Sequence, residues 1–310
     1  MTEIKNQRVI MLVGVSGSGK STFAKELAKK YHINKIFSSD EYRYKLLGSE
    51  SDQSNNNLVF ETMHKDIVTA LNNGDSIIYD ATNLSSKRRK HFIYHVAMKR
   101  KYKFEAICYV VPTKFSLACA NNKKRDRQLD ENVIKKQCLS FQLPLYSEGW
   151  DEIVIKYNDN HMMSVNMVNA VMDYNQNNKY HTLTLGNHLY RTAELLKDEY
   201  YFLKSAGLLH DIGKPLSAQI KNDGSYGFYN HEKYSAMLSL LVTESICPNE
   251  ISSVNDPLMF DLLYSRALLI QYHMEHYQNN EQRMLKIEKE LGYALYNDLL
   301  KLNEADKKAH

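Results

Sequence analysis

The sequence predicts two domains, an α/β domain with a parallel sheet and helices on both of its faces, followed by an all-helical domain. Two observations carry this prediction. The first half of the chain alternates short apolar runs with segments of helical spacing, which is typical of parallel strands joined by helices. After Tyr157 the strand-like runs stop, and long segments with apolar residues at helical spacing take over. We place the boundary near residues 158–160, which gives domains of residues 1–158 and 159–310.

The strands of the first domain are expected at five apolar runs, and helices between them. The runs are RVIMLVG (8–14), KIFSSD (35–40), DSIIYDATN (75–83), FEAICYVV (104–111) and EIVIKY (152–157). The segments 21–32 and 85–103 have helical spacing. In the second half, helices are expected over 185–213 and 284–310.

The composition is that of a folded protein large enough for two cores. Its 310 residues exceed the usual size of one hydrophobic core. With 43% hydrophobic residues, 25% charged residues and 5 Pro, the chain is neither fibrous nor disordered. The formal net charge of +4 permits a polyanionic partner without requiring one. The four cysteines form no C-x-x-C pair, so they indicate neither a disulfide framework nor a zinc cluster.

No segment of the sequence suggests a membrane anchor or a leader. No apolar run approaches the roughly 20 residues that cross a bilayer. The early run VIMLVG leads straight into a glycine-rich loop, unlike a signal peptide. We therefore expect a soluble, cytoplasmic protein without membrane association.

The stretch GVSGSGKS at 14–21 predicts a phosphate-binding loop. It satisfies G-x-x-x-x-G-K-[ST] and stands between an apolar strand and a helical segment, the context that distinguishes it from a chance glycine-rich turn. Backbone N–H groups and the helix N-terminus favour phosphates, Lys20 reaches the β- and γ-phosphates, and Ser21 ligates Mg²⁺. ATP or another NTP with Mg²⁺ is the expected cofactor. The nucleotide contacts are expected at Gly14, Ser16, Gly17, Ser18, Gly19, Lys20, Ser21 and Thr22.

Charged residues after two further strands predict the acceptor side of the same site. Asp40 ends the second apolar run, at the sheet edge where doubly wound folds bind ligands, and suits a base for an attacking hydroxyl. The alternative for Asp40 is a helix N-cap. Arg43, one turn on, suits an acceptor phosphate, and the alternative is a solvated helix residue. Asp80 ends another strand as a partner for Mg²⁺, Ser21 or Arg43, or as a turn residue.

The cationic segment 121–134 predicts a lid over the transferring phosphoryl group. Its residues Arg125 and Arg127 precede a helical segment, and positive charge there would stabilise the transition state. The alternative is a solvated face.

These motifs together resemble the polynucleotide 5′-kinase family over residues 8–157. The resemblance implies that Lys20 and Ser21 hold the ATP phosphates, that Asp40 is the general base, and that Arg43 contacts the acceptor's phosphate. It also implies a lid arginine on ATP and an acceptor role for the DATN stretch, which contains Asp80 and Asn83. Two positions depart from the family pattern, Asn121 in place of a lid arginine and Leu129-Asp130 in place of Val-Pro.

Fewer sequence features support a polymeric acceptor than support a kinase. Relatives with the same loops phosphorylate small molecules, which keeps a small-molecule kinase open. Lys87, Arg88, Arg89 and Lys90 on the expected helix 85–103 suit nucleic-acid phosphates, and a plain solvated helix is the alternative. The pair His91 and His95 has no further ligand nearby in the sequence, and we interpret it as structural.

Imidazoles and carboxylates in the second half predict a metal centre inside the helices. Several helices that each supply one such group toward a common point are how helical bundles build metal sites. Nitrogen and oxygen donors without thiolate suit Mn²⁺, Fe²⁺, Ni²⁺, Zn²⁺ or Mg²⁺, and the sequence does not choose among them. The candidate ligands are His188, His210, Asp211, His231, His273 and Asp306.

The ordered series His188, His210-Asp211 and Asp306 resembles the HD phosphohydrolase superfamily over residues 160–310. The resemblance implies a first metal held by these four residues and, with His231 and His273, a second metal bridged by Asp211. Members with one metal and with two both occur. It also implies hydrolysis of a phosphate ester by an activated water, with Lys214 offsetting charge on the phosphoryl oxygens. The alternative for Lys214 is a helix C-terminal cation. We leave His181 and His276 out of the predicted site.

Together the two domains predict nucleic-acid end healing. The first would phosphorylate a 5′-hydroxyl, and the second would remove a 3′-phosphate or a 2′,3′-cyclic phosphate, so that a ligase could act on RNA or DNA strand ends. Two alternatives stay open. One is a small-molecule kinase fused to a nucleotide or cyclic-nucleotide phosphohydrolase, and the other is an ATP-binding regulator of the second domain.

Overall fold

The chain folds into two compact units. A computed structural model describes residues 7–99, 101, 103–156, 163–178, 180–243, 257–278 and 280–309. The first unit comprises Met1–Gln137 and Pro144–Lys156, and the second comprises Cys138–Leu143 and Tyr157–His310. The short segment 138–143 therefore groups with the second unit, although it lies well before the expected boundary. That boundary, at residues 158–160, falls outside the described residues.

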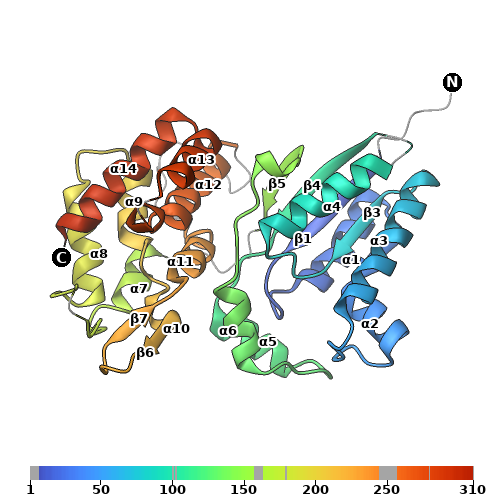
Figure 1. The fold of residues 1–310 in the computed structure, drawn as a ribbon, viewed down its shortest axis with the longest axis horizontal. Coiled ribbons are helices and arrows are strands. Elements are labelled where there is room, and N and C mark those ends of the chain that lie inside the picture. Colours follow the sequence, from blue (N-terminus) through green and yellow to red (C-terminus); the bar gives the residue numbers. More distant parts are fainter. Residues whose placement is uncertain are drawn as a thin grey trace. The chain divides into compact units, whose positions relative to one another are not determined.

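A five-stranded parallel sheet forms the core of the first unit (Figure 1). Its strands are β1 (Gln7–Val13), β2 (Lys35–Ser38), β3 (Ile77–Asp80), β4 (Phe104–Val110) and β5 (Glu152–Ile155), in the order β2-β3-β1-β4-β5. On the central strand, Val9 pairs with Ile77 on one side and Ala106 on the other. The strands β1 and β3 are buried along nearly their whole length, which is typical of a parallel sheet covered on both faces. The sheet predicted from five apolar runs is confirmed.

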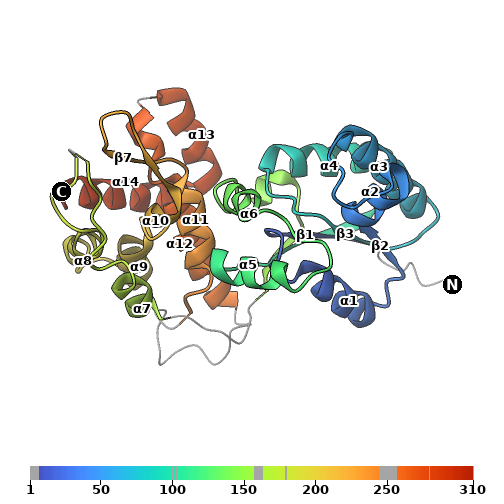
Figure 2. The same ribbon diagram turned by 90° about the horizontal axis from the view of Figure 1, so that it is seen from below.

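Helices cover both faces of this sheet. Figure 2 shows α1 (Lys20–Tyr31) on one face and α3 (Asn56–Asn72) and α4 (Ser86–Lys99) on the other. On the first face, Phe23 and Leu27 of α1 pack into one core cluster with Ile10 and Ile78 of the sheet. The remaining helices of this unit are α2 (Ser39–Leu47), α5 (Phe115–Lys123), α6 (Glu131–Cys138) and the 3₁₀ helix η1 (Tyr146–Glu148).

A fully buried ion pair joins α4 to η1 and corrects one expectation. Arg89 Nε and Nη2 each donate to Glu148 at 2.7 Å, and both side chains are 0% exposed. The indole of Trp150 donates to the same carboxylate at 2.9 Å. Arg89 is therefore a core residue, and the idea that it contacts nucleic acid is wrong. Its neighbours Lys87, Arg88 and Lys90 are exposed.

Where the structure describes it, the second unit is helical apart from one small hairpin. Its helices are α7 (Ser164–Asn169), α8 (Leu185–Leu195), α9 (Tyr201–Leu209), α10 (Lys214–Ser217), α11 (His231–Ser239), α12 (Pro257–Tyr272), η2 (Glu275–Gln278), α13 (Glu281–Leu291) and α14 (Tyr293–Lys308). The strands β6 (Ala218–Ile220) and β7 (Tyr226–Phe228) pair antiparallel, which corrects the expectation of helices alone. The expected long helix over 284–310 is two helices, because Gly292 takes φ 76° between α13 and α14.

The helices of the second unit pack around α9 and α12. α8 and α12 both lie against α9, α11 packs on α12, and α14 contacts α8, α9 and α12. Leucines and isoleucines fill this core, but several of its buried side chains are histidines and aspartates. Those polar groups come from the ends of different helices and meet at one place. Within the described parts of the chain, no helix combines the length and the apolar character that a bilayer crossing needs.

Candidate active site and metal centre

The loop between β1 and α1 has the geometry that its glycines allow. Gly17 has φ 81° and Gly19 has φ 93°, a left-handed conformation in which side chains with a Cβ are strained. A Cβ atom on Gly17 would also lie 2.2 Å from the carbonyl oxygen of Ala118, and one on Gly14 would lie 2.8 Å from that of Val111. The backbone therefore packs too closely here for any larger residue.

Lys20 and Ser21 stand beside the carboxylate of Asp80. The ammonium of Lys20 is buried and donates to the carbonyl oxygen of Val15 at 2.7 Å. Burial lowers the pKa of Lys20 to about 8, against the opposing effect of the negative charges of Asp80 and Asp40. Burial likewise raises the pKa of Asp80, against the charge of Lys20 and a hydrogen bond from the Ser21 hydroxyl. The hydroxyl and the carboxylate are oxygen donors of the kind that Mg²⁺ takes, so these residues fit the expected ion.

Two backbone N–H groups of the loop donate to acceptors of the protein itself. The backbone N–H of Ser16 donates to Gln137 Oε1 at 2.7 Å, and that of Ser18 donates to Val15 O at 3.2 Å. Thr22 is exposed on the first turn of α1. Asn121, which stands where a lid arginine was expected, donates through Nδ2 to the carbonyl oxygen of Gly17 at 2.9 Å.

Three arginines contact the carboxylate of Asp40. Arg43 Nη1 lies 2.9 Å from Asp40 Oδ1, Arg127 Nη1 lies 3.1 Å from the same oxygen, and Arg125 Nη2 lies 3.3 Å from Oδ2. The N-cap of α2 is Ser38, which makes no side-chain capping bond, so Asp40 is not the N-cap. The structure thus brings together the expected base, the expected acceptor contact and both lid arginines.

Arg43 and Arg127 are held differently within this cluster. Arg43 is buried, and its Nε and Nη2 atoms lie 3.4 and 3.2 Å from Asn56 Oδ1. Arg127 is largely buried, yet its Nε atom makes no hydrogen bond. Asn83 lies apart from the cluster. Its Nδ2 donates to the carbonyl oxygen of Leu12 at 2.8 Å and its φ is 47°, so its amide nitrogen supports the end of β1.

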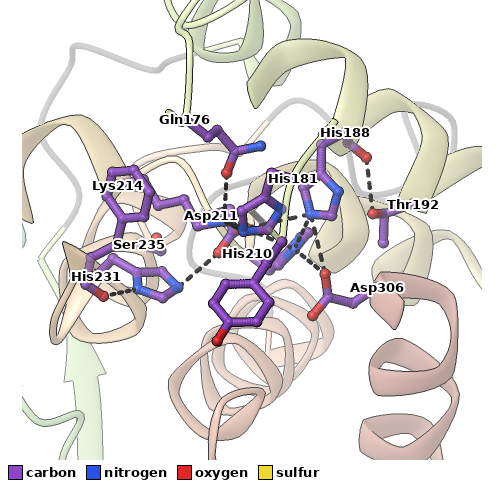
Figure 3. A network of polar contacts seen from close by, with 12 residues as sticks. Gln176, His181, His188, Thr192, His210, Asp211, Lys214, His231, Ser235 and Asp306 are labelled. Atoms are coloured by element: carbon purple, nitrogen blue, oxygen red, sulfur yellow. Dashed lines mark hydrogen bonds and ion pairs between the residues drawn. The ribbon is translucent and has the colours of Figure 1, made fainter. Parts of the chain in front are cut away.

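The six predicted ligands of the second unit converge on one buried point, shown in Figure 3 for all but His273. His188 comes from α8, His210 and Asp211 follow α9, His231 begins α11, His273 follows α12, and Asp306 lies on α14. All six are at most 4% exposed. Their donor atoms form two sets within metal-binding distance, His188, His210, Asp211 and Asp306, and Asp211, His231 and His273.

The Nδ1 atoms of the histidines face main-chain carbonyl oxygens. Those of His210, His231 and His273 lie 2.8, 2.7 and 2.7 Å from the carbonyl oxygens of Gly207, Phe228 and Ile270. A carbonyl oxygen only accepts, so each Nδ1 carries the hydrogen and each Nε2 turns its lone pair to the centre. The Nδ1 atom of His188 lies 3.4 Å from Ala309 O in the same sense.

Asp211 divides its two oxygens between the two sets. Oδ2 lies 3.4 Å from both His188 Nε2 and His210 Nε2, while Oδ1 lies 2.8 Å from His231 Nε2 and 3.4 Å from His273 Nε2. Oδ1 and the latter two nitrogens make no hydrogen bond. Buried acceptors that face one another without a donor need a cation, and nitrogen and carboxylate donors suit a divalent metal. The residues therefore fit one or two such ions.

Charge compensation around Asp211 keeps the carboxylates of the centre ionised. Although burial raises the pKa of Asp211, the charges of Lys214 and His210 outweigh it and hold the pKa well below its usual range. Burial also opposes the charged form of His210, but without a metal Asp211 and Asp306 raise its pKa to about 10, so a metal would displace the proton from Nε2. Burial lowers the pKa of His273.

Four polar residues around the centre were missed or left out by sequence reasoning. The hydroxyl of Tyr277 donates to Asp306 Oδ2 at 3.0 Å, and that of Thr192 donates to the carbonyl oxygen of His188 at 2.9 Å. Gln176 and His181 both contact the ammonium of Lys214. Tyr277 lies four residues after the ligand His273, and Thr192 four after His188. That spacing was the available signal.

One family model matches part of the chain. It is described as an AAA domain and matches residues 9–144, which is less than half of the chain. A search of the curated proteins found no match. The matched residues include the loop 14–21, Asp40, Asp80 and both lid arginines.

Solved structures of kinases are similar at low identity. A fungal RNA kinase shares 16% identity at a TM-score of 0.37, over 50% of this chain and 77% of that one. Shikimate kinase from Acinetobacter baumannii, in complex with shikimate, shares 16% at 0.34, over 50% and 86%. A structure of a Pnkp1/Rnl/Hen1 complex shares 20% at 0.32, over 40% of this chain and 41% of that one. TM-scores this low carry no argument about the acceptor. The family match and the strand-loop-helix geometry of residues 7–31 together show an α/β P-loop domain with a parallel sheet.

Proposed function

We propose that this protein heals both ends of a broken nucleic-acid strand. The first unit phosphorylates a 5′-hydroxyl with ATP, and the second removes a 3′-phosphate or opens a 2′,3′-cyclic phosphate. The observation that supports this is that one chain carries a P-loop motif with the Asp40 cluster in its first unit and a buried His/Asp centre in its second. The two products, a 5′-phosphate and a free 3′-hydroxyl, are the ends that a ligase joins.

In the first unit the phosphoryl group passes from ATP to the acceptor oxygen. Lys20 and the loop N–H groups hold the phosphates, and Ser21 with Asp80 would hold Mg²⁺. Asp40 accepts the proton of the 5′-hydroxyl as the new O–P bond forms and the β–γ bond breaks. The arginines that contact Asp40 bring positive charge to the place where the transferring group becomes most negative.

In the second unit a phosphate ester is hydrolysed. His188, His210, Asp211 and Asp306 would hold one divalent ion, and Asp211, His231 and His273 a second. A bound ion supplies Lewis acidity toward the phosphoryl oxygens and acidifies a water molecule. The ammonium of Lys214, 2.5 Å from Asp211 Oδ2, offsets charge on the same phosphoryl group. The oxygen of a water molecule forms a new bond to phosphorus as the P–O bond to the 3′-oxygen breaks, and the 3′-oxygen takes a proton from solvent and leaves as a hydroxyl.

An assay of both strand ends tests the proposal. Nicked RNA or DNA with a 5′-hydroxyl and a 3′-phosphate is incubated with ATP and a divalent metal, and both termini are followed. We expect the wild type to modify both ends, Lys20→Ala to lose only the 5′ reaction, and Asp211→Ala to lose only the 3′ reaction. Absence of 5′ transfer to any polynucleotide would overturn the proposal, and loss of both reactions in either variant would contradict independent sites.

The same assay separates the alternatives. Phosphorylation of free nucleosides or sugars without any transfer to oligomers would indicate a small-molecule kinase. A regulator is expected to need ATP binding but no transfer, so Asp40→Ala would keep its function while Lys20→Ala would abolish it.

A further inference from the structure

We propose that Gln176 and His181 hold the ammonium of Lys214 in place, so that its positive charge lies beside the phosphoryl group of the substrate. This inference rests on the proposed hydrolytic function of the second unit. Neither residue is a metal ligand in the arrangement described above, and both lie in the segment 174–185 that precedes and begins α8.

Lys214 is held by three acceptors at once (Figure 3). Its Nζ atom lies 2.5 Å from Asp211 Oδ2, donates to Gln176 Oε1 at 2.7 Å, and lies 3.1 Å from His181 Nε2. An ammonium has three hydrogens and no lone pair, so three acceptors match its donors. The side chain is 4% exposed, and the Phe228 ring lies 5.4 Å from Nζ. A flexible lysine is thereby confined to one position.

The orientation of the Gln176 amide is fixed from its other end. Its Nε2 donates to the carbonyl oxygen of Leu183 at 3.3 Å, which leaves Oε1 toward Lys214. The side chain is 1% exposed, so no solvent competes for these bonds. For His181, the lysine can only donate, so Nε2 accepts and the imidazole is neutral there.

The backbone of the segment 174–185 is fastened on two sides. Leu185 N donates to Tyr174 O at 2.9 Å, which closes the loop at the start of α8. Asn177, with φ 39°, accepts from Tyr226 N at 2.9 Å and donates to Gly224 O at 3.1 Å, which ties it to the hairpin of β6 and β7. The small hairpin thus has a role, because it supports the loop that holds Lys214.

The position of Nζ explains why this matters for hydrolysis. Asp211 Oδ2 is shared between Lys214 and the set that contains His188 and His210, so an ammonium stands next to the first metal position. A phosphoryl oxygen bound at that metal would meet a fixed positive charge alongside it. Positive charge placed in advance stabilises the transition state more than a mobile side chain does.

The test is a double-mutant cycle on the full chain loaded with metal. Gln176→Met and His181→Phe keep the shape of each side chain and remove the acceptor. We expect each to lower kcat for 3′-phosphate removal about 10-fold, the size reported for partners that orient functional groups. His181→Gln, which returns an acceptor near the Nε2 position, should recover most of the rate. Gln282→Met, at an exposed position of α13, is the control and should change nothing.

The decisive measurement is kcat for 3′-phosphate removal when Gln176→Met or His181→Phe is combined with Lys214→Met. If Gln176 and His181 act through Lys214, neither change lowers the rate further there. Multiplicative losses in that background, or a loss of bound metal in the single variants, would overturn the inference.

A binding measurement separates this inference from the proposed function. Inorganic phosphate is titrated into the metal-loaded protein, with the same variants. Suppose that no ester is hydrolysed, that Gln176→Met binds phosphate more weakly than the wild type, and that Gln176→Met combined with Lys214→Met binds it no more weakly than Lys214→Met alone. The proposed function then fails and the positioning role stands. Phosphate affinity that is equal in wild type, Gln176→Met and His181→Phe would overturn the positioning role.

Discussion

The Nε2 atoms of His188 and His210 lie 3.2 Å apart in the core of the second unit. The Nδ1 of each ring faces a main-chain carbonyl oxygen, so in a metal-bound form both Nε2 lone pairs would point to the space between the rings. Asp306 Oδ1 completes the group at 3.1 and 3.3 Å from the two nitrogens. Three acceptors at such distances are stable together when a cation stands among them.

We predict that the wild-type chain binds two metal ions and that different substitutions of the ligands remove one ion or both. The double variant His231→Gln and His273→Gln should keep one ion, because the set with His188, His210 and Asp306 remains. Asp211→Ala should keep none, since Asp211 belongs to both sets. Elemental analysis after gel filtration gives the count. At 100 times the dissociation constant, an ion should raise the free energy of unfolding by about 2.7 kcal/mol. One ion in both the wild type and the double variant would contradict the two-ion arrangement.

Tyr277 should tune the affinity of the first metal position. Its hydroxyl donates to Asp306 Oδ2, which turns Oδ1 toward His188 and His210. Removal of that hydrogen bond in Tyr277→Phe should weaken metal binding about 10-fold or more. The measurement is a competition with a chromophoric chelator. Tyr293→Phe, at a side chain that is 77% exposed, is the matched control. Equal affinities in the two variants would remove Tyr277 from the centre.

Much of the fold and the gathering of the site residues was predictable because both depend on local patterns. Five apolar runs became five parallel strands, and the loop 14–21 stands between a strand and a helix as its motif requires. The six residues predicted as ligands meet because each stands at a helix end or one turn from it.

What sequence reasoning missed depends on contacts between distant segments. Arg89 reads as one of four consecutive basic residues, yet it alone faces the core, where it pairs with Glu148 59 residues away. Gln176 lies 38 residues from Lys214, and Tyr277 29 residues from Asp306. No spacing in the sequence marks these pairs themselves, and the one signal for Tyr277 was its position four residues after His273. The hairpin of β6 and β7 was missed because three-residue strands are too short to show alternation.

His64 should make the first unit acid-sensitive. Burial, with smaller effects of His95 and His91, lowers the pKa of His64 to about 4 from 6.5. Between these values the unfolded chain binds a proton that the folded chain excludes. Stability from this group is therefore full above pH 6.5 and falls as the pH drops toward 4, by at most about 3 kcal/mol.

Denaturant unfolding of the first unit checks the effect of His64. The single tryptophan, Trp150, lies in this unit and reports on it alone. His64→Gln keeps an acceptor for the Tyr79 hydroxyl, 3.1 Å from His64 Nε2, and does not titrate. We expect this variant to lose much of the pH dependence between 4 and 6.5, while the exposed His91→Gln keeps most of it. An unchanged slope in His64→Gln would assign the dependence elsewhere.

We predict that Arg125 contacts ATP and that Arg127 contacts the acceptor. Burial has the largest effect on the pKa values of Lys20 and Asp80, the groups of the nucleotide side, and the positive charge of Arg125 lowers both pKa values. Burial also has the largest effect on the pKa of Arg43, the group of the acceptor side, and the positive charge of Arg127 lowers that pKa further. Arg125 thus acts on residues expected to hold the nucleotide and Arg127 on a residue expected to hold the acceptor, although both contact Asp40.

Steady-state kinetics of 5′ phosphorylation test this division. Arg125→Ala should raise KM for ATP about 10-fold, the equivalent of one charge-assisted hydrogen bond, and leave KM for the acceptor near its wild-type value. Arg127→Ala should do the reverse. Lys124→Ala, an exposed cation of the same segment, controls for net charge and should change neither constant by much. If Arg125→Ala alters only the acceptor constant, the two arginines have exchanged roles. If both variants lower kcat alone, the pair acts on the transition state through Asp40.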